Sequence, residues 1–348
     1  MRERLQKLVD KAKANSKKTK VIFLSNIAGQ TVMADDYNNF SVLGEYLKEV
    51  EAEEIYKALL LMDFQVEQFT DEISLLKSIL NENHIIKENL VLLNMAQKGT
   101  KVGRKSLVPA FCDMEDILYT GSNPYVVSLC RNKYHTGCIL DYHGILSPKS
   151  WLYMNGSGWL HDEPPLNKEI IAKPNNESCS MGVDLSNVGK FNNFMMEKII
   201  QMSEDFNQDI IVQEFIKGYE IEVPCIVDDR ILSLIPVGIN FNGKNCMEDS
   251  VLTYEVRVKD MYEYYNFYDV DSSIVENIRE ISTKVMSILG ITGFGRIDFR
   301  VNGNGDAYVI DIATNPHITK ASSFNKVFEL MGFTHAEMIG CLIALVKS

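Results

Sequence analysis

The sequence lacks any long hydrophobic run and any excess of positive charge. No stretch approaches the roughly eighteen apolar residues that a membrane-spanning helix needs, so no membrane contact is expected. The first twenty residues are basic but lack the apolar centre of a signal peptide. The formal net charge of −12 argues against nucleic acid as the main ligand. These absences leave small molecules and other proteins as the expected partners.

Paired cysteines and the common glycine-rich nucleotide motifs are also missing. The 7 cysteines form no CxxC pair and no His/Cys cluster, a pattern typical of reduced thiols in the cytoplasm rather than of zinc sites. No GxGxxG follows a predicted strand and no GxxxxGK[ST] occurs, which excludes a Rossmann-type dehydrogenase and a Walker A loop. What remains is a globular composition, 46% hydrophobic and 24% charged, over 348 residues. That length predicts two or three domains.

Apolar runs alternate with helical patterns in the amino-terminal third. Residues 20–26 and 90–94 read as buried strands and residues 65–69 as a short strand, with helices over 40–61 and 71–82 between them. A basic helix precedes them. This β-α-β-α-β order predicts a small parallel sheet covered by helices, and therefore an α/β fold.

Two aspartates occur in a predicted hairpin near the carboxyl terminus. Asn304-Gly305 is a typical two-residue hairpin loop, and with that loop Asp298 and Asp311 lie directly opposite each other on one face. Like charges so placed repel, so a shared proton or a bound cation is expected between them. If the turn is instead Gly303-Asn304, one aspartate faces solvent.

Two further segments combine apolar strands with polar exits. Residues 169–183, EIIAKPNNESCSMGV, place Lys173 at a strand end before a loop of small residues, which can bind phosphate but also fits an ordinary surface loop. Residues 210–222, IIVQEFIKGYEIE, offer an apolar slot with polar edges. Such a slot suits a nucleobase and ribose, although half-buried β structure gives the same pattern.

Taken together and in order, these segments resemble the D-alanine–D-alanine ligase branch of the ATP-grasp superfamily over about residues 90–348. The resemblance implies an α/β (α+β) ATP-grasp fold, with nucleotide bound between two α+β subdomains that follow a small parallel α/β domain. The implied domains are 1–118, 119–210 and 211–348. The segments that carry it are YTGS at 119–122 with Lys133, IIAKPNNESCSMGV, IIVQEFIKGYEIEV, GRIDF and VIDIATNP.

The resemblance also implies which residues bind the nucleotide. They are two lysines on the ATP phosphates, a loop that closes over them, three residues around the adenine and one on the ribose. In that order they are Lys133 and Lys173; Ser178, Cys179 and Ser180; Gln213, Phe215 and Ile216; and Glu220.

Catalytic and metal-binding roles follow from the same resemblance. Arg296 matches the arginine that stabilises the anionic tetrahedral intermediate, Arg257 a phosphate-binding cation, and Ser180 belongs to the closing loop. Asp298 and Asp311 match ligands of Mg²⁺, for which Mn²⁺ is an alternative, and Asn315 is a further candidate ligand.

The implied activity is an ATP- and Mg²⁺-dependent carboxylate–amine ligase that works through an acyl phosphate. Its partners are ATP and small carboxylate and amine substrates, and a homodimer is compatible with the family. Family members typically read Glu-x-Asn at the second metal strand and glycine further on, whereas this chain has Ala313 and His317. These departures motivate the alternative of a nucleotide-binding regulatory or catalytically impaired protein.

A basic loop replaces an acidic pattern expected after the third strand. It reads QKGTKVGRKS and carries Lys98, Lys101, Arg104 and Lys105. If this loop reaches the active site, it favours an extra anionic group on the substrate, so D-alanine is not the expected substrate. A solvated basic loop is the alternative.

Overall fold

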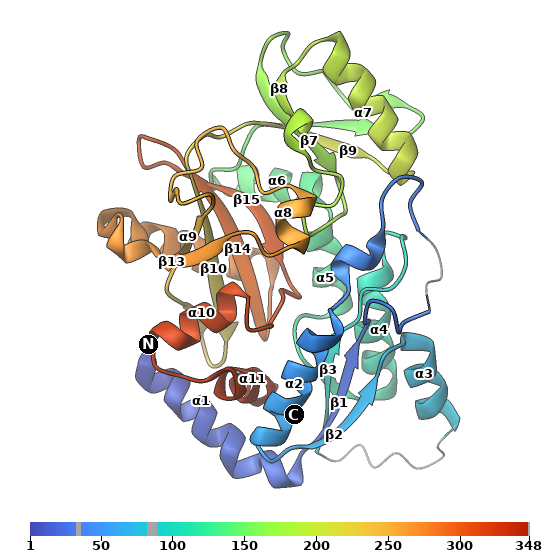
Figure 1. Cartoon of the computed structure of the whole chain (residues 1–348), viewed down its shortest axis with the longest axis vertical. Coiled ribbons are helices and arrows are strands. Elements are labelled where there is room, and N and C mark those ends of the chain that lie inside the picture. The colour runs from blue at the N-terminus through green and yellow to red at the C-terminus, as the bar shows by residue number, and fades with distance from the viewer. Residues whose placement is uncertain (33–35, 82–88, 347–348) are drawn as a thin grey trace.

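Three β-sheets form the framework of the protein in the computed structural model, which describes residues 1–32, 36–81 and 89–346 (Figure 1). The first sheet is parallel, in the order β2-β1-β3-β4, and lies at the lower right of the view. The predicted α/β alternation at the amino terminus is therefore confirmed. Its strands are β1 (Lys20–Ser25), β2 (Gln65–Phe69), β3 (Leu90–Met95) and β4 (Leu118–Tyr119).

The predicted helix over residues 40–61 is only partly correct. Val42–Glu45 forms a 3₁₀ turn, and helix α2 spans Glu49–Leu61. The Glu51 carboxylate accepts the Lys48 N–H at 2.7 Å, and such a contact at the third helical position starts a helix at that point. The residues before it are therefore free to place Glu45 inside the molecule, where it is fully buried.

One apolar core joins the two ends of the chain. Helices α1 (Arg2–Asn15) and α11 (His335–Ala344) pack against each other and against α2. Leu5 and Phe23 share this core with Phe328, which lies in α10 (Ser323–Leu330). The carboxyl-terminal helices thus cover the amino-terminal sheet, and the division into domains 1–118, 119–210 and 211–348 stays a prediction.

The second sheet is antiparallel and lies at the top of Figure 1, with helix α7 (Asn193–Phe206) packed on it. Ile199 of the helix and Ile170 and Val212 of the sheet form its apolar centre. Its order is β6-β5-β9-β7-β8. The strands are β5 (Ser150–Met154), β6 (Gly158–Trp159), β7 (Glu169–Pro174), β8 (Val188–Lys190) and β9 (Ile210–Glu214).

The third sheet, also antiparallel, lies between the other two and carries the predicted hairpin (Figure 1). Helix α9 (Ser272–Leu289) packs against it through Val275, Ile278 and Val285. Its order is β13-β12-β10-β14-β15, with β11 beside β10. The strands are β10 (Tyr219–Val227), β11 (Ile231–Ser233), β12 (Val237–Asn240), β13 (Glu263–Asn266), β14 (Phe294–Val301) and β15 (Ala307–Ala313).

A glycine, Gly218, lies in the connection between β9 of the second sheet and β10 of the third. Gly218 has φ +138°, and a Cβ at this position would lie 1.9 Å from the carbonyl oxygen of Val301. Only glycine fits such a close backbone approach. The short connection from β9 to β10 is therefore held against the hairpin strand β14.

The remaining helices surround the junction of the sheets. Residues 124–142 form two helices, because the Asn132 side chain accepts the His135 N–H at 2.9 Å and caps a new helix at Lys133. This break fixes the position of Lys133. The helices are α3 (Glu72–Asn81), α4 (Leu107–Glu115), α5 (Pro124–Arg131), α6 (Lys133–Tyr142) and α8 (Tyr254–Val258).

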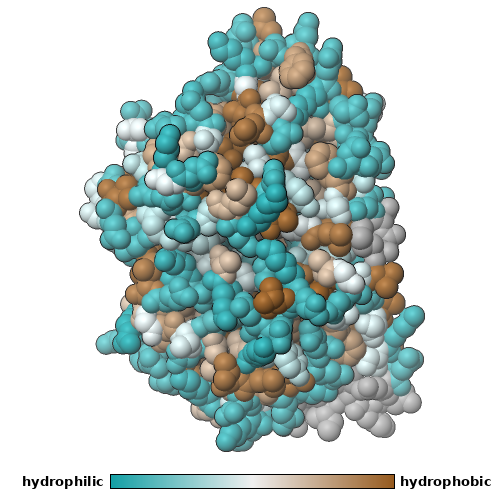
Figure 2. Space-filling model, in the orientation of Figure 1, coloured by the Kyte–Doolittle hydropathy of each residue, from teal (hydrophilic) through white to brown (hydrophobic). Residues whose placement is uncertain are grey.

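The surface in the view of Figure 2 is mainly hydrophilic, with apolar residues scattered over it. Among the described residues no single helix is long and apolar enough to cross a membrane. The bent pair Ser323–Leu330 and His335–Ala344 passes that test together, by length and composition only, and most of both helices is buried in the protein.

Candidate active site

A cavity of about 480 Å³ lies where the three sheets meet, within the size range of small-molecule sites. Every residue that the sequence predicted for the site lines this cavity. They are Lys133, Lys173, Ser178, Cys179, Ser180, Gln213, Phe215, Ile216, Glu220, Arg257, Arg296, Asp298, Asp311 and Asn315.

The two hairpin aspartates are directly opposed, as predicted, but not through the predicted turn. Near the loop, Phe299 pairs with Val309, a register that belongs to a three-residue loop over 303–305. An irregularity beside Asp298 then adds one residue to β15, and Asp298 pairs with Asp311. A β-bulge of this kind re-aims side chains. The bulge and the longer loop cancel, so the predicted pairing is correct and the predicted two-residue loop is wrong.

The opposed carboxylates meet different cations. Arg296 donates two hydrogen bonds of 2.7 Å to Asp298, and Lys133 donates one of 2.9 Å to Asp311. Burial raises the pKa of Asp298 to about 7, with Glu222 and Asp311 adding to the rise and Arg296 opposing it. Burial also acts to raise the pKa of Asp311, but Lys133 and Lys173 outweigh it and hold that pKa well below its usual range.

The donor set of the hairpin suits a single Mg²⁺. Asp298 and Asp311 offer buried carboxylate oxygens, the ligands that Mg²⁺ prefers, and Mg²⁺ is commonly held by one or two carboxylates plus substrate phosphates. In residues 1–32, 36–81 and 89–346 no cluster of three His, Cys, Asp or Glu could hold a metal alone. Ala313, which pairs with Arg296, supplies no donor, whereas the Asn315 side chain is a neutral oxygen donor at the cavity wall. Mn²⁺ accepts the same oxygen ligands.

The two predicted phosphate-binding lysines reach the cavity from different elements. Lys133 begins α6 and donates to the Glu177 carbonyl at 2.7 Å as well as to Asp311. Lys173, on β7, lies 3.4 Å from the carbonyl oxygen of Ile310. Burial and the nearby Lys133 together lower the pKa of Lys173 to about 8, while Asp311 opposes both. An anion bound beside Lys173 would compensate its ammonium group for the water lost on burial.

The loop after β7 turns sharply at the cavity. Cys179 and Ser180 both have φ +54°, a left-handed conformation that costs energy for non-glycine residues. The Cys179 Sγ lies 3.5 Å from Nε2 of His317. Burial lowers the pKa of His317, which favours the neutral ring. The neighbouring Ser178 instead contacts the amino-terminal part of the chain, where its N–H donates to the Glu45 carboxylate at 3.2 Å.

An apolar slot with polar edges lies beside the lysines. Phe215 and Ile216 form part of the cavity wall together with Val251 and Leu252. At one edge Gln213 is buried, and its Nε2 donates to the Ser150 hydroxyl at 3.0 Å.

The other edge of the slot carries Glu220, which pairs with Arg257 at 3.2 Å and with Arg300 at 3.1 Å. The slot therefore combines apolar walls with two polar edges.

A buried glutamate that sequence reasoning gave no role holds the two predicted catalytic arginines. Glu222 is fully buried on β10 and lies 3.0 Å from Arg257 and 3.2 Å from Arg296. Burial acts to raise its pKa, but the two arginines outweigh it and keep the carboxylate charged. Its position on the same face as Glu220 was visible in the sequence; its arginine partners were not.

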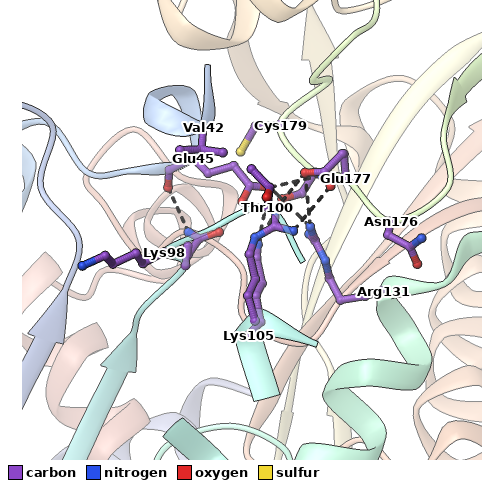
Figure 3. Close-up of polar contacts among 12 residues, drawn as sticks. Val42, Glu45, Lys98, Thr100, Lys105, Arg131, Asn176, Glu177 and Cys179 are labelled. Atoms are coloured by element: carbon purple, nitrogen blue, oxygen red, sulfur yellow. Dashed lines mark hydrogen bonds and ion pairs between the residues drawn. The ribbon is translucent and has the colours of Figure 1, made fainter. Parts of the chain in front are cut away.

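A second charged group lies where the amino-terminal segments meet the loop after β7; sequence reasoning noted its basic loop but not the partners of that loop. We call Glu45, Arg104, Lys105, Arg131 and Glu177 the amino-terminal charge cluster; Figure 3 shows several of these side chains converging from separate parts of the chain. Its side chains are at most 10% exposed. The basic loop 98–105 therefore reaches the cavity, through Lys105. Glu45 could have been suspected from its place in the apolar run VLGEYL.

Known proteins are similar to this chain in sequence and in fold. It is 27% identical over 258 residues to a D-alanine--D-alanine ligase of Maridesulfovibrio salexigens, covering 70% of this chain and 76% of that protein. A D-alanine--D-alanine ligase of Streptococcus pyogenes is 23% identical over 261 residues, covering 71% and 69%.

Solved structures agree in fold. The D-alanine--D-alanine ligase of Bacillus anthracis, complexed with ATP, matches with a TM-score of 0.68 at 16% identity, over 94% of this chain and 97% of that one. The VanG D-Ala:D-Ser ligase of Enterococcus faecalis matches with a TM-score of 0.65 at 15% identity, over 94% and 99%. These neighbours confirm the predicted ATP-grasp fold.

The family model for the carboxyl-terminal part of D-ala D-ala ligases matches residues 157–344, more than half of the chain. That span contains the loop after β7, the apolar slot and the aspartate hairpin. The chain therefore belongs to the D-Ala–D-Ala ligase family of ATP-grasp proteins.

Proposed function

We propose that this protein is an ATP- and Mg²⁺-dependent carboxylate–amine ligase that forms an amide or peptide bond through an acyl phosphate. One observation carries the proposal: a single cavity combines the opposed Asp298–Asp311 pair, the cations Lys133, Lys173 and Arg296, and an apolar slot. Family membership supports ATP-dependent ligase activity.

The residues divide the work by position. Phe215 and Ile216 hold the adenine, Gln213 and Glu220 bind the polar edge of the nucleoside, and Lys133 with Lys173 hold the phosphates. Mg²⁺, held by Asp298 and Asp311, would neutralise charge on the phosphate oxygens when bound. The main-chain turn at Cys179 and Ser180 covers the phosphates and keeps water away from them.

The chemistry runs in two displacements. A substrate carboxylate oxygen attacks the γ-phosphorus, the bond to the β-phosphate oxygen breaks, and ADP leaves an acyl phosphate. An amine then attacks the carbonyl carbon, and the phosphate leaves as the amide forms and the amine loses a proton. Arg296, held by Asp298 and Glu222, faces the developing negative charge, as electrostatic stabilisation of this step requires.

Phosphate release from Mg·ATP, measured with pools of amino acids, other small acids and amines while product masses are recorded, tests the proposal. Phosphate with a condensed product is the expected result. Pyrophosphate would mean that the carboxylate is adenylated, which contradicts the acyl-phosphate route.

A second candidate function is favoured by one observation. Ala313 faces Arg296 across the hairpin and offers no metal ligand, so the chain could bind nucleotide as a regulatory or catalytically impaired protein. Tight binding of Mg·ATP with no product from any acid and amine pool would select this candidate.

The proposal extends to the setting of the enzyme. All seven cysteines are free, which supports the cytoplasm as its compartment. We also propose the domains 1–118, 119–210 and 211–348, and a homodimer. Light scattering on the purified protein gives the mass that checks the dimer.

A further inference from the structure

The amino-terminal charge cluster has almost balanced charges. Arg104 lies 2.9 Å from Glu45 and 2.7 Å from Glu177. Arg131 lies 3.5 Å from Glu45 and 3.7 Å from Glu177. Two guanidinium groups thus match two carboxylates, and all four side chains are nearly buried. Paired in this way, they form a fixed group at one end of the cavity, where Arg131 and Glu177 line the wall.

Lys105 is the cation in excess of that balance. Its ammonium group lies 3.6 Å from Glu45, which the two arginines already hold, and it donates to the Ser178 hydroxyl at 3.1 Å. The side chain is 7% exposed and lines the cavity. Burial lowers the pKa of Lys105 to about 7, with Arg131 and Arg104 adding to the fall and Glu45 opposing it. The cluster thus holds three cations against two carboxylates, and Lys105 shares Glu45 with both arginines. Such a buried excess of positive charge is stabilised by an incoming anion.

The same end of the cavity is unsuited to a substrate ammonium group. Glu45 already accepts the Ser178 N–H and hydroxyl besides its three cationic partners. Glu177 accepts the Tyr37 hydroxyl at 2.7 Å and Gln208 Nε2 at 3.0 Å. Both carboxylates are therefore fully used within the described part of the chain, and an added cation would meet Lys105.

We propose that the Lys105 end of the cavity binds an anionic group of the substrate, so that the acid which this protein activates carries a second carboxylate or a phosphate-type group. The reacting carboxylate lies toward Arg296, and the second anionic group contacts Lys105. This assignment rests on the proposed ligase function where it names the substrate, but the anion site itself can be measured without turnover.

Four matched acids test the site, because they share one carboxylate and two methylene groups and differ only at the far end. They are butyrate (methyl), β-alanine (ammonium), succinate (carboxylate) and 3-phosphonopropionate (phosphonate). Binding is measured calorimetrically with Mg²⁺ and a non-hydrolysable ATP analogue present, and repeated with the set one methylene longer. We expect the two dianions to bind about 10- to 100-fold more tightly than butyrate, the range for one charged hydrogen bond, and β-alanine to bind most weakly. The better of the two dianions identifies the second group.

Three substitutions locate the preference. Lys105→Met should remove it, Lys105→Arg should keep it, and Lys101→Met, which removes an exposed lysine of the same loop outside the cavity, should leave it unchanged. Thermal unfolding of each variant checks that it folds. If Lys105→Met does not fold, the test is the pH dependence of succinate affinity in the wild type and in Lys105→Arg. Arg104, Arg131, Glu45, Cys179 and His317 also face Lys105. In the wild type succinate affinity should fall between about pH 7 and 9, whereas the arginine variant should lose this fall, because arginine stays charged.

The outcomes separate the anion site from the ligase. Equal binding of butyrate and succinate, tighter binding of β-alanine, or a preference that survives Lys105→Met would overturn the anion site. Hydroxylamine in place of the amine, with Mg·ATP, reports acyl-phosphate formation from the same acids as a hydroxamate. Hydroxamate from β-alanine and not from the dianions would overturn the anion site and uphold the ligase. A dianion preference without any hydroxamate would uphold the anion site and contradict the ligase.

Discussion

The two ends of the cavity hold similar side chains in different states of charge balance. At the hairpin end, the pKa of Asp298 is raised to about 7 and that of Lys173 is lowered to about 8, both chiefly by burial. In the amino-terminal charge cluster, Glu45 is equally buried, yet Lys105, Arg104 and Arg131 hold its pKa well below the usual range. Where burial disfavours the charged form of a side chain, as at Asp298 and Lys173, a ligand of opposite charge would stabilise that form. Where buried charges already pair with one another, as around Glu45, they hold the structure together and need no ligand. Lys105 belongs to the cluster but follows the hairpin pattern, because burial lowers its pKa to about 7.

The largest expected effect comes from breaking the hairpin end. Asp298→Asn removes one of two opposed carboxylates while keeping the shape of the side chain. We expect Mg·ATP-dependent turnover to fall by about 100-fold or more, the scale seen when one electrostatic group is lost from an active site. Thermal stability should change little, because burial already disfavours the charged form of Asp298, whose pKa is raised to about 7.

Asp162→Asn, at an exposed aspartate, is the matched control for this measurement of ADP formation. Wild-type turnover in the Asp298 variant would remove the hairpin from the reaction.

A change in the amino-terminal charge cluster should instead lower the free energy of unfolding. Glu45→Gln leaves Arg104, Arg131 and Lys105 with one buried carboxylate fewer, and breaking a buried ion pair costs about 3–5 kcal/mol of the free energy of unfolding. The same change at Glu214, whose pair with Lys168 is about one third exposed, should cost about 1 kcal/mol or less. Urea unfolding of both variants measures the difference, and equal losses would show that the cluster is no scaffold.

A moderate effect is expected from the titration of Lys173. With a pKa of about 8, the ammonium form of Lys173 is nearly complete at pH 7, half lost at pH 8 and increasingly lost above that value. ATP binds the charged form better, so ATP affinity should fall by up to about tenfold per pH unit above 8.

Lys173→Arg should flatten that pH dependence, since arginine stays charged, and Lys173→Ala should weaken binding at every pH. Lys190→Ala, at an exposed lysine, is the control. An unchanged ATP affinity in Lys173→Ala would refute the assignment of this lysine to the phosphates.

The smallest expected effect sharpens the hairpin end. Ala313→Asn adds an oxygen donor opposite Arg296, where the related ligases typically carry asparagine. We expect the Mg²⁺ concentration for half-maximal turnover to fall a few-fold, because a further protein oxygen replaces a water ligand. A rise in the required Mg²⁺ would show that the position is closed to the metal.

The hairpin end was predictable because its residues lie in short, ordered segments. Lys173 with its loop, Gln213 to Glu220, and Asp298 with Asp311 each keep a local pattern of strand and turn. Even there the turn was wrong: the sequence favours Asn304-Gly305 as a loop, and the compensating bulge before Asp311 depends on packing that no local pattern encodes.

The amino-terminal charge cluster could not be predicted in the same way. Its members come from four separate segments, and no local pattern indicates that these segments meet. The basic loop was noticed, but whether it pointed to solvent or to the cavity depended on tertiary structure. The predicted helix over residues 40–61 was a further source of error, because Glu45 lies in a 3₁₀ turn that precedes helix α2.

The central claim, that one cavity binds Mg·ATP with its phosphates at the hairpin end, is tested most directly by a crystal structure with Mg²⁺ and a non-hydrolysable ATP analogue. The account predicts the adenine between Gln213 and Ile216, phosphate oxygens about 3 Å from Lys133 and Lys173, and Mg²⁺ on Asp298 and Asp311. A nucleotide bound elsewhere, or phosphates that lie against Lys105 instead, would contradict it.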